Sequence, residues 1–211
     1  MFKTKAGLAL ILVALAGCSR DGELTAQGIT VTRSACPAVA IPTHTGDVTL
    51  FSPESSRDAS AIDVVAQVTN LRSTCDDTGE YILSNATFDV QAQRRNTAGT
   101  REVTLPYFAT VVQGGQNVVT KSVGQVVLRF ADGEARATAS GSASGRVLRS
   151  AATLPDEIRR EIVRPRKAGD PDAAIDPLAR PDVRAAVTRA TFELLVGFQL
   201  TDEQLRYNVT R

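Results

Sequence analysis

The chain has 211 residues, of which 43% are hydrophobic and 22% charged, and this composition is typical of an ordinary globular protein. Its 24 basic residues nearly cancel its 23 acidic ones, so the sequence has no overall positive charge that could attract a nucleic acid. Aromatic residues make up only 5%, and tryptophan is absent, which leaves few rings for stacking on sugars or bases. We therefore expect a folded protein that has no nucleic-acid partner.

The first 17 residues differ in character from the rest of the chain. Lys3 and Lys5 form a short basic start, and an uncharged apolar run follows from residue 8 to residue 15. This run is shorter than the roughly 20 residues that a helix needs to cross the hydrocarbon core of a bilayer. We therefore predict an export signal over residues 1–17 and no permanent transmembrane helix.

The end of this leader, Leu15-Ala16-Gly17-Cys18, resembles the lipobox of bacterial lipoproteins. The resemblance implies cleavage before Cys18, a diacylglycerol on its sulfur and a further acyl chain on its amino group. Each buried methylene contributes about 0.8 kcal/mol, so two or three chains form a durable anchor. In this family Ser19 implies retention at the outer membrane, facing the periplasm. The alternative is a plain signal peptide cleaved nearby, which still exports the protein.

Two cysteines remain once Cys18 is assigned to the lipid. Cys36 and Cys75 form an even pair in an exported and oxidising compartment, and we therefore predict a disulfide between them. The alternatives are two reduced, buried thiols or a pair of metal ligands. Two sulfurs and the single histidine, His44, fall short of a structural zinc set, so we expect no metal and no cofactor.

The mature chain begins with a polar segment, residues 18–30, which has no periodic apolar face and which we interpret as a flexible tether. We interpret residues 31–211 as a single β-domain. Five stretches in it place apolar residues at every second position, as strands with one buried face do. These rows occupy residues 62–68, 86–92, 103–111, 126–130 and 190–200.

Turn sequences separate these rows. Residues 96–99, 114–117 and 132–133 suit hairpin loops, which predicts consecutive hairpins from about residue 80 to residue 148. Few helical segments are available to cover the apolar faces. We therefore predict a mainly β fold, an antiparallel β-sandwich of about seven or eight strands that is loosely immunoglobulin-like. The alternative is an up-and-down β-barrel, although the small side chains of residues 135–145 would fill a barrel interior poorly.

One region, residues 153–181, interrupts the strand pattern just before the last row. Leu154, Ile158 and Ile162 have helical spacing, with Thr153 as the expected cap and Pro155 in the first turn, and a long loop follows. Long loops in compact domains are often functional, so this insertion is the favoured interaction surface. Its basic residues could grip phosphate groups or could instead pair with the acids around them. These candidate residues are Arg159, Arg160, Arg164, Arg166 and Lys167. Near the C-terminus, Thr201 and Gln204 have capping-box spacing, which predicts one helical turn over residues 201–205.

No catalytic template fits the sequence, and we assign no catalytic residue. The nearest approach to a serine-hydrolase elbow, residues 141–145, has Ala143 at the nucleophile position. Asp170, Asp172 and Asp176 follow calcium-loop spacing in part, but Ile175 replaces the glycine that such a loop requires. We therefore predict a lipid-anchored envelope protein that is not an enzyme and has an accessory or structural role. Its expected partners are the membrane and an envelope protein or polymer. The alternatives are a small-ligand carrier and an envelope-polymer hydrolase that uses distant carboxylates.

Overall fold

The computed structural model describes residues 22–25, 28–31, 34–167, 169–172 and 174–211. The leader, Cys18 and Ser19 lie outside these described residues, so the lipobox stays a prediction. The chain divides into two units, residues 1–33 and residues 34–211. In the first unit, β1 (Gly22–Thr25) and β2 (Gly28–Val31) pair antiparallel, with Gly22 opposite Val31. The hairpin lies where we expected a tether without regular structure.

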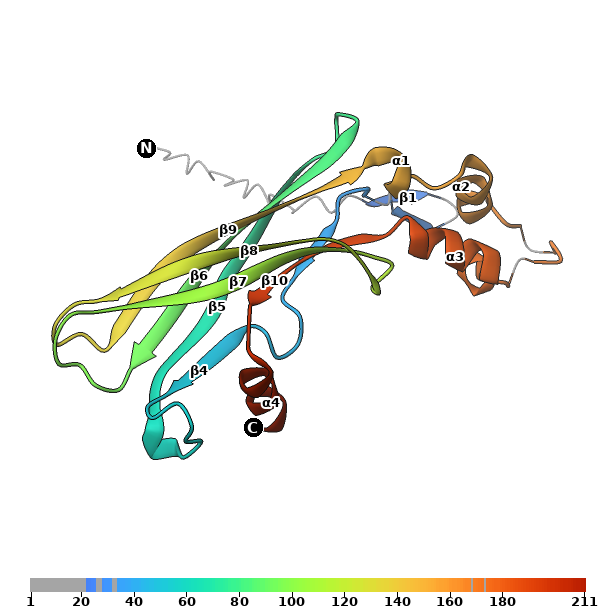
Figure 1. The fold of residues 1–211 in the computed structure, drawn as a ribbon. Coiled ribbons are helices and arrows are strands. Elements are labelled where there is room, and N and C mark those ends of the chain that lie inside the picture. Colours follow the sequence, from blue (N-terminus) through green and yellow to red (C-terminus); the bar gives the residue numbers. More distant parts are fainter. Residues whose placement is uncertain (1–21, 26–27, 32–33, 168, 173) are drawn as a thin grey trace, which may run out of the picture. The chain divides into compact units, whose positions relative to one another are not determined.

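The second unit, residues 34–211, contains two four-stranded sheets (Figure 1). The first sheet has the order β3 (Ala38–Ala40), β10 (Phe192–Phe198), β7 (Arg101–Gln113), β8 (Asn117–Phe130). The second has the order β4 (Asp47–Phe51), β5 (Ile62–Asp76), β6 (Tyr81–Arg94), β9 (Arg136–Leu148). Every pair is antiparallel except β3 with β10, which is parallel. The predicted mainly β fold is confirmed, with two sheets whose strands are antiparallel apart from the β3–β10 pair.

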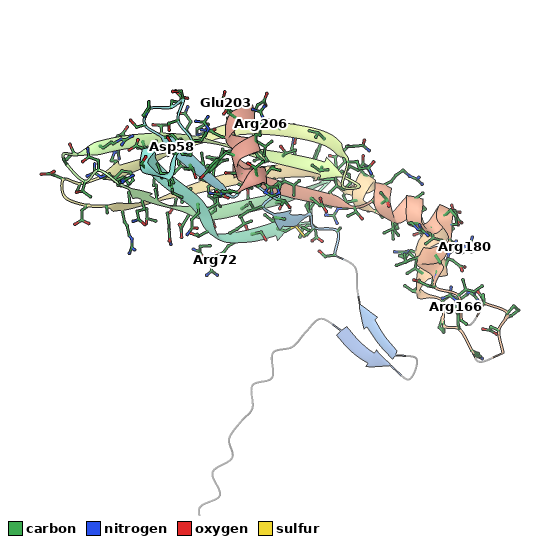
Figure 2. All side chains as sticks on the ribbon, turned by 90° about the horizontal axis from the view of Figure 1, so that it is seen from below. Asp58, Arg72, Arg166, Arg180, Glu203 and Arg206 are labelled. Atoms are coloured by element: carbon green, nitrogen blue, oxygen red, sulfur yellow. A yellow bond between two sulfur atoms is a disulfide. The ribbon has the colours of Figure 1, made fainter. Side chains whose placement is uncertain are left out.

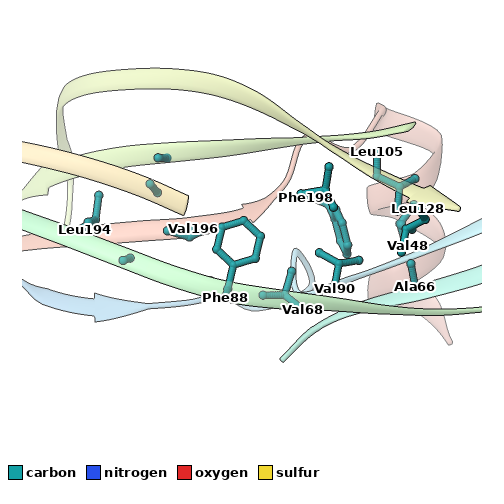
Figure 3. Close-up of a cluster of buried hydrophobic side chains, with 14 of the residues drawn as sticks. Val48, Ala66, Val68, Phe88, Val90, Leu105, Leu128, Leu194, Val196 and Phe198 are labelled. Atoms are coloured by element: carbon teal, nitrogen blue, oxygen red, sulfur yellow. The ribbon is translucent and has the colours of Figure 1, made fainter. Parts of the chain in front are cut away.

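The alternating rows of the sequence face the space between the sheets. In β6 every second residue from Ile82 to Arg94 is buried, and β5 contributes the buried side chains of Val64, Ala66 and Val68. Phe88 and Val90 of β6 lie among Leu105, Leu128, Leu194, Val196 and Phe198 of the opposite sheet (Figure 3). Burying one such side chain stabilises the fold by roughly 1.5–3 kcal/mol, so the pattern of period two determines which face of each strand is covered.

Small residues in β8 and β9 let aromatic rings pass between the sheets. A Cβ atom on Gly141 would lie 2.3 Å from the ring of Phe88, and one on Gly124 would lie 2.5 Å from the ring of Tyr107. The two rings meet edge to face, with centroids 5.0 Å apart. The Tyr107 hydroxyl then donates a hydrogen bond to the Ser142 carbonyl at 2.6 Å. The small side chains of β9 therefore make room for rings of neighbouring strands.

The predicted run of consecutive hairpins is correct only in part. The β5–β6 and β7–β8 connections are hairpins, and Gly114 and Gly115 supply positive φ angles of 62° and 74° in the second one. The β6–β7 and β8–β9 connections instead cross from one sheet to the other. Gly99 and Gly133, with φ of 73° and 79°, turn the chain there. Turn residues specify local backbone geometry, but they do not specify which strand the next segment joins.

Helices occur mainly between β9 and β10. They are α1 (Arg149–Ala152), α2 (Asp156–Val163), the 3₁₀ turn η2 (Pro177–Ala179) and α3 (Pro181–Arg189). A second 3₁₀ turn, η1 (Ala59–Ala61), precedes β5. The interruption of the β pattern therefore extends beyond residues 153–181, and we call residues 149–191 the helical insertion. No helix of the described chain is long and apolar enough to cross a bilayer.

Two details of the predicted helices need correction. Thr153 does not cap α2, because it follows α1 and its hydroxyl donates to the Arg149 carbonyl at 2.7 Å, while Pro155 holds the N-cap position. Helix α3 was not predicted from the sequence, although its buried residues Val183 and Ala186 have helical spacing. Two buried residues within a polar segment are too few to give a clear helical periodicity in the sequence.

The C-terminal helix is longer than expected. The predicted capping box is present, since the Thr201 hydroxyl accepts from the Gln204 amide at 3.2 Å and the Gln204 side chain accepts from the Thr201 amide at 2.9 Å. It begins α4 (Asp202–Thr210), which continues well past one turn. Asn208 is buried and donates to the carbonyls of His44 and Asp47 at 2.9 and 2.8 Å, which attaches α4 to the loop before β4.

Candidate functional site

The helical insertion lies at the end of the sandwich where the chain enters this unit. Strand β3 runs parallel to β10, and Ala38 lies opposite Glu193, only four residues after the end of α3. Ser34, the first residue of the unit, is therefore separated from the insertion end by only a few residues of chain. The crossing loops near residues 95–100 and 131–135 lie at the opposite end, because β6 and β8 run away from the insertion.

An ion-pair cluster holds the middle of the insertion together, and Figure 2 shows Arg166 and Arg180 within it. Glu161 of α2 accepts from Arg166 at 3.2 Å and lies 3.4 Å from Arg180 and 3.9 Å from Arg164. Asp172 pairs with Arg164 and lies 3.6 Å from Arg166. Only 14% of the Arg166 side chain is exposed, so this pair is better shielded from water than an ordinary surface pair.

A further pair joins the loop to the start of α3. The Arg180 guanidinium donates to Asp182 at 2.8 Å. This hydrogen bond lowers the pKa of Asp182 and raises that of Arg180. Asp182 also lies in the first turn of α3, where a negative charge is favourable for the helix.

The five basic candidate residues are largely occupied within the insertion. Arg164 and Arg166 belong to the cluster, and Arg159 pairs with Asp156 at 2.7 Å. Arg160 donates to the Asp156 carbonyl at 3.3 Å, and the side chain of Lys167 pairs with no carboxylate of the described residues. Of the two alternatives that the sequence left open, the structure therefore favours self-pairing over a set of free arginines that grip phosphates.

Exposed apolar side chains are the feature of the insertion that the sequence analysis missed. Val163 is 61% exposed at the end of α2, Ile175 is 51% exposed before η2, and Leu178 is 45% exposed within η2. The two elements α2 and η2 contact each other. No residue of α2 is buried, so the apolar side of this helix is only partly covered. Large apolar side chains exposed on neighbouring elements are a common mark of an interaction surface.

A surface hollow lies beside α4, away from the insertion. It has a volume of about 280 Å³, and Phe51, Arg57, Asp63, Arg101 and Glu203 are among its lining residues. Arg101 donates two hydrogen bonds to Asp63, at 2.7 and 2.6 Å, and this contact lowers the pKa of the Asp63 carboxyl. Arg57 pairs with Glu203 at 2.8 Å and lies 5.0 Å from the centre of the Phe51 ring. Each guanidinium of this hollow thus already holds a carboxylate.

The apolar core fills the space between the sheets with side chains of both sheets. Further hollows of about 420 and 450 Å³ lie along the second sheet, and outward-facing residues such as Gln67, Gln91 and Ser142 line them. A carrier of small apolar ligands would instead need an apolar pocket that encloses most of the ligand.

The two cysteines of the body form the predicted disulfide, which joins Cys36 to Cys75 across 39 positions of sequence. It fastens the segment before β3 to the end of β5. His44 is exposed in a turn with φ of 65°, where its carbonyl accepts a hydrogen bond from Asn208. In the part of the chain that the structure describes, no group of three histidine, cysteine or acidic side chains could hold a metal ion.

The three aspartates with partial calcium-loop spacing have separate local roles. Asp170 accepts from the Lys167 amide at 2.9 Å, Asp172 belongs to the ion-pair cluster, and Asp176 caps η2 by accepting from the Leu178 amide at 2.9 Å. Each carboxylate therefore has a structural partner, and the three do not converge on one point.

Comparison of the chain with protein-family models, with curated proteins and with solved structures finds no match.

Proposed function

We propose that this chain is an exported bacterial lipoprotein that is acylated on Cys18 and acts in the cell envelope by contact rather than by catalysis. The observation that carries the proposal is the use of the three cysteines. The structure joins Cys36 to Cys75, which accounts for the two cysteines of the body, and the third cysteine of the sequence, Cys18, directly follows the apolar leader. Disulfides are typical of exported proteins, and a cysteine at the end of a leader suits lipid attachment.

The location follows from the same residues. Ser19 after the acylated cysteine favours the outer membrane, with the body facing the periplasm. Residues 34–211 form one compact unit, so the acyl chains would hold a folded domain next to the bilayer. This proximity supports an accessory or structural role that involves an envelope protein or polymer.

Replacing the acceptor residue tests the anchor. Cells that express the full chain or its Cys18→Ser variant are fed an alkyne fatty acid and then fractionated. We expect label and membrane sedimentation for the full chain, and loss of both for Cys18→Ser. Cys36→Ser/Cys75→Ser is the matched control, because it removes two sulfurs but leaves the lipobox intact, and it should keep the label. A Cys18→Ser chain that still sediments with membranes would refute the anchor.

Gentle detergent extraction followed by purification tests the contact role. We expect the acylated protein to co-purify with an envelope component in a stable ratio. A pure monomer that turns over an envelope polymer would instead establish an enzyme, and a pure monomer that retains a small molecule would establish a carrier.

A further inference from the structure

We infer that the helical insertion contacts the bilayer that carries the anchor, through Val163, Ile175 and Leu178; this inference rests on the proposed function. These three side chains are 45% to 61% exposed and belong to α2, η2 and the residues just before η2. In an aqueous compartment their exposure is unfavourable, and entry into the headgroup and acyl boundary of a membrane would remove them from water.

The length of chain before the body favours the membrane as the occupant of this surface. From Cys18 to Gly22 and from Val31 to Ser34 the backbone spans at most about 14 Å and about 10 Å. The pairing of Gly22 with Val31 brings their Cα atoms within about 5 Å of each other. The first residue of the body therefore lies within roughly 30 Å of the acylated cysteine.

That first residue belongs to the insertion end of the sandwich. Ala38 lies opposite Glu193, immediately after the insertion, whereas α4 follows the other end of β10. Figures 1 and 2 both show α4 well separated from α2 and α3. A strand such as β5, with 15 residues, is about 50 Å long. The short connection therefore allows the insertion end to reach the membrane surface that holds the acylated cysteine.

The ion-pair cluster makes this contact less costly. Glu161, Asp172 and Asp182 are each paired with arginine, so these carboxylates do not face the headgroups as free negative charges. The side chains of Arg160 and Lys167 pair with no carboxylate of the described residues and remain able to contact lipid phosphates. The insertion has nine basic and seven acidic residues, an excess of only two positive charges, so we expect apolar burial to dominate and added salt to weaken the contact only modestly.

A tryptophan reporter tests the inference, because the chain contains no tryptophan of its own. The mature chain with Cys18→Ser receives an N-terminal histidine tag and is bound to vesicles of brominated phosphatidylcholine, phosphatidylglycerol and a nickel-chelating lipid. This tether replaces the acyl chains, so the result does not depend on whether Cys18 is acylated in cells. Leu178→Trp reports on the insertion, and Val209→Trp, at a 55% exposed position of α4, is the matched control.

We expect bromine to quench the Leu178→Trp emission at least about twofold more than that of Val209→Trp, since bromine quenches only indoles that reach the acyl boundary. Adding Val163→Asp to the Leu178→Trp chain should remove most of this difference without changing the urea midpoint. Equal quenching of the two reporters on tethered protein would overturn the inference and leave the anchor untouched. Quenching of Leu178→Trp combined with absent acylation in cells would support the bilayer contact and refute the proposed anchor.

Discussion

Arg94 is a buried arginine whose guanidinium contacts both loops that cross between the sheets. Replacing it tests how much these contacts stabilise the sandwich. It is only 2% exposed, at the end of β6, and its guanidinium lies 5.2 Å from the centre of the Phe130 ring. Its Nε and Nη2 atoms lie 2.8 Å from four backbone carbonyls of the two crossing loops, and their three N–H groups donate to this set, while Nη1 is buried without a partner among the described residues. These carbonyls belong to Thr97, Gly99, Ala131 and Glu134.

The magnitude follows from these contacts. Hydrogen bonds contribute about 1 kcal/mol each after exchange with water, so the three N–H groups that donate to the loops account for about 3 kcal/mol. Loss of the buried stem and of the ring contact adds to this sum, while removal of a buried charge subtracts from it. We therefore expect Arg94→Ala to lower the free energy of unfolding by about 3–5 kcal/mol. Arg94→Lys should cost roughly half as much, because an ammonium group can donate to the carbonyls that Nη2 contacts but leaves the Glu134 carbonyl without the Nε–H donor.

Urea unfolding of the disulfide-bonded protein, followed by far-UV circular dichroism, measures both changes. Arg129→Ala is the matched control, since this arginine is also on a strand but its side chain is 80% exposed, and we expect a change within about 0.5 kcal/mol. A loss below about 1 kcal/mol for Arg94→Ala would refute the reasoning, because it would mean that the crossing loops keep their positions without the guanidinium.

Three further predictions concern other parts of the body. Reduction of the Cys36–Cys75 bond, which closes a loop of 39 positions, should lower the stability by about 4 kcal/mol, as measured by urea unfolding with and without dithiothreitol. The hydrogen bonds from Arg101 lower the pKa of Asp63 below 3.8, its value in the unfolded chain. The stability that this pair contributes is therefore fully present above pH 3.8 and is lost as the pH falls through the lower pKa of the folded state. Asp63→Asn should therefore reduce the loss of stability between about pH 6 and pH 2.5. Thr201→Ala should cost about 1 kcal/mol by removing the N-cap of α4, measured from the thermal midpoint.

Each of these has a matched comparison. Asp77→Asn, in an exposed turn, should leave the acid dependence unchanged, and a similar flattening there would contradict the assignment to Asp63. Thr43→Ala, at an exposed position outside any helix, should leave the thermal midpoint unchanged. A reduced protein as stable as the oxidised one would show that the cross-link adds nothing to the fold.

Several features of the fold were predictable from residues alone because local chemistry determines them. The alternation in β5 and β6 predicted which side chains are buried, since a strand exposes its two faces at alternate positions. The spacing of Thr201 and Gln204 predicted the start of α4, because a capping box involves only four consecutive residues. The parity of the cysteines predicted the disulfide.

Other features depend on contacts between residues far apart in sequence. Nothing near Gly99 or Gly133 signals that these turns lead to the opposite sheet, because a turn has similar local geometry in either case. Arg94 resembles any polar residue at a strand end, and its burial depends on carbonyls up to 40 positions away. The hollow beside α4 brings Arg57 to Glu203, 146 positions apart, so no spacing rule could have found it.

The features that bear on function also include some that follow from local sequence and others that depend on the tertiary structure. The sequence by itself predicts a leader and a candidate acyl site at Cys18, and it indicates the interruption of the β pattern before the last strand, because composition and short motifs are local properties of the chain. Only the tertiary structure decided that Arg164 and Arg166 pair within the insertion and that Val163, Ile175 and Leu178 stay exposed. Pairing and exposure depend on which elements fold against one another, and that arrangement is set by the balance of packing over the whole unit.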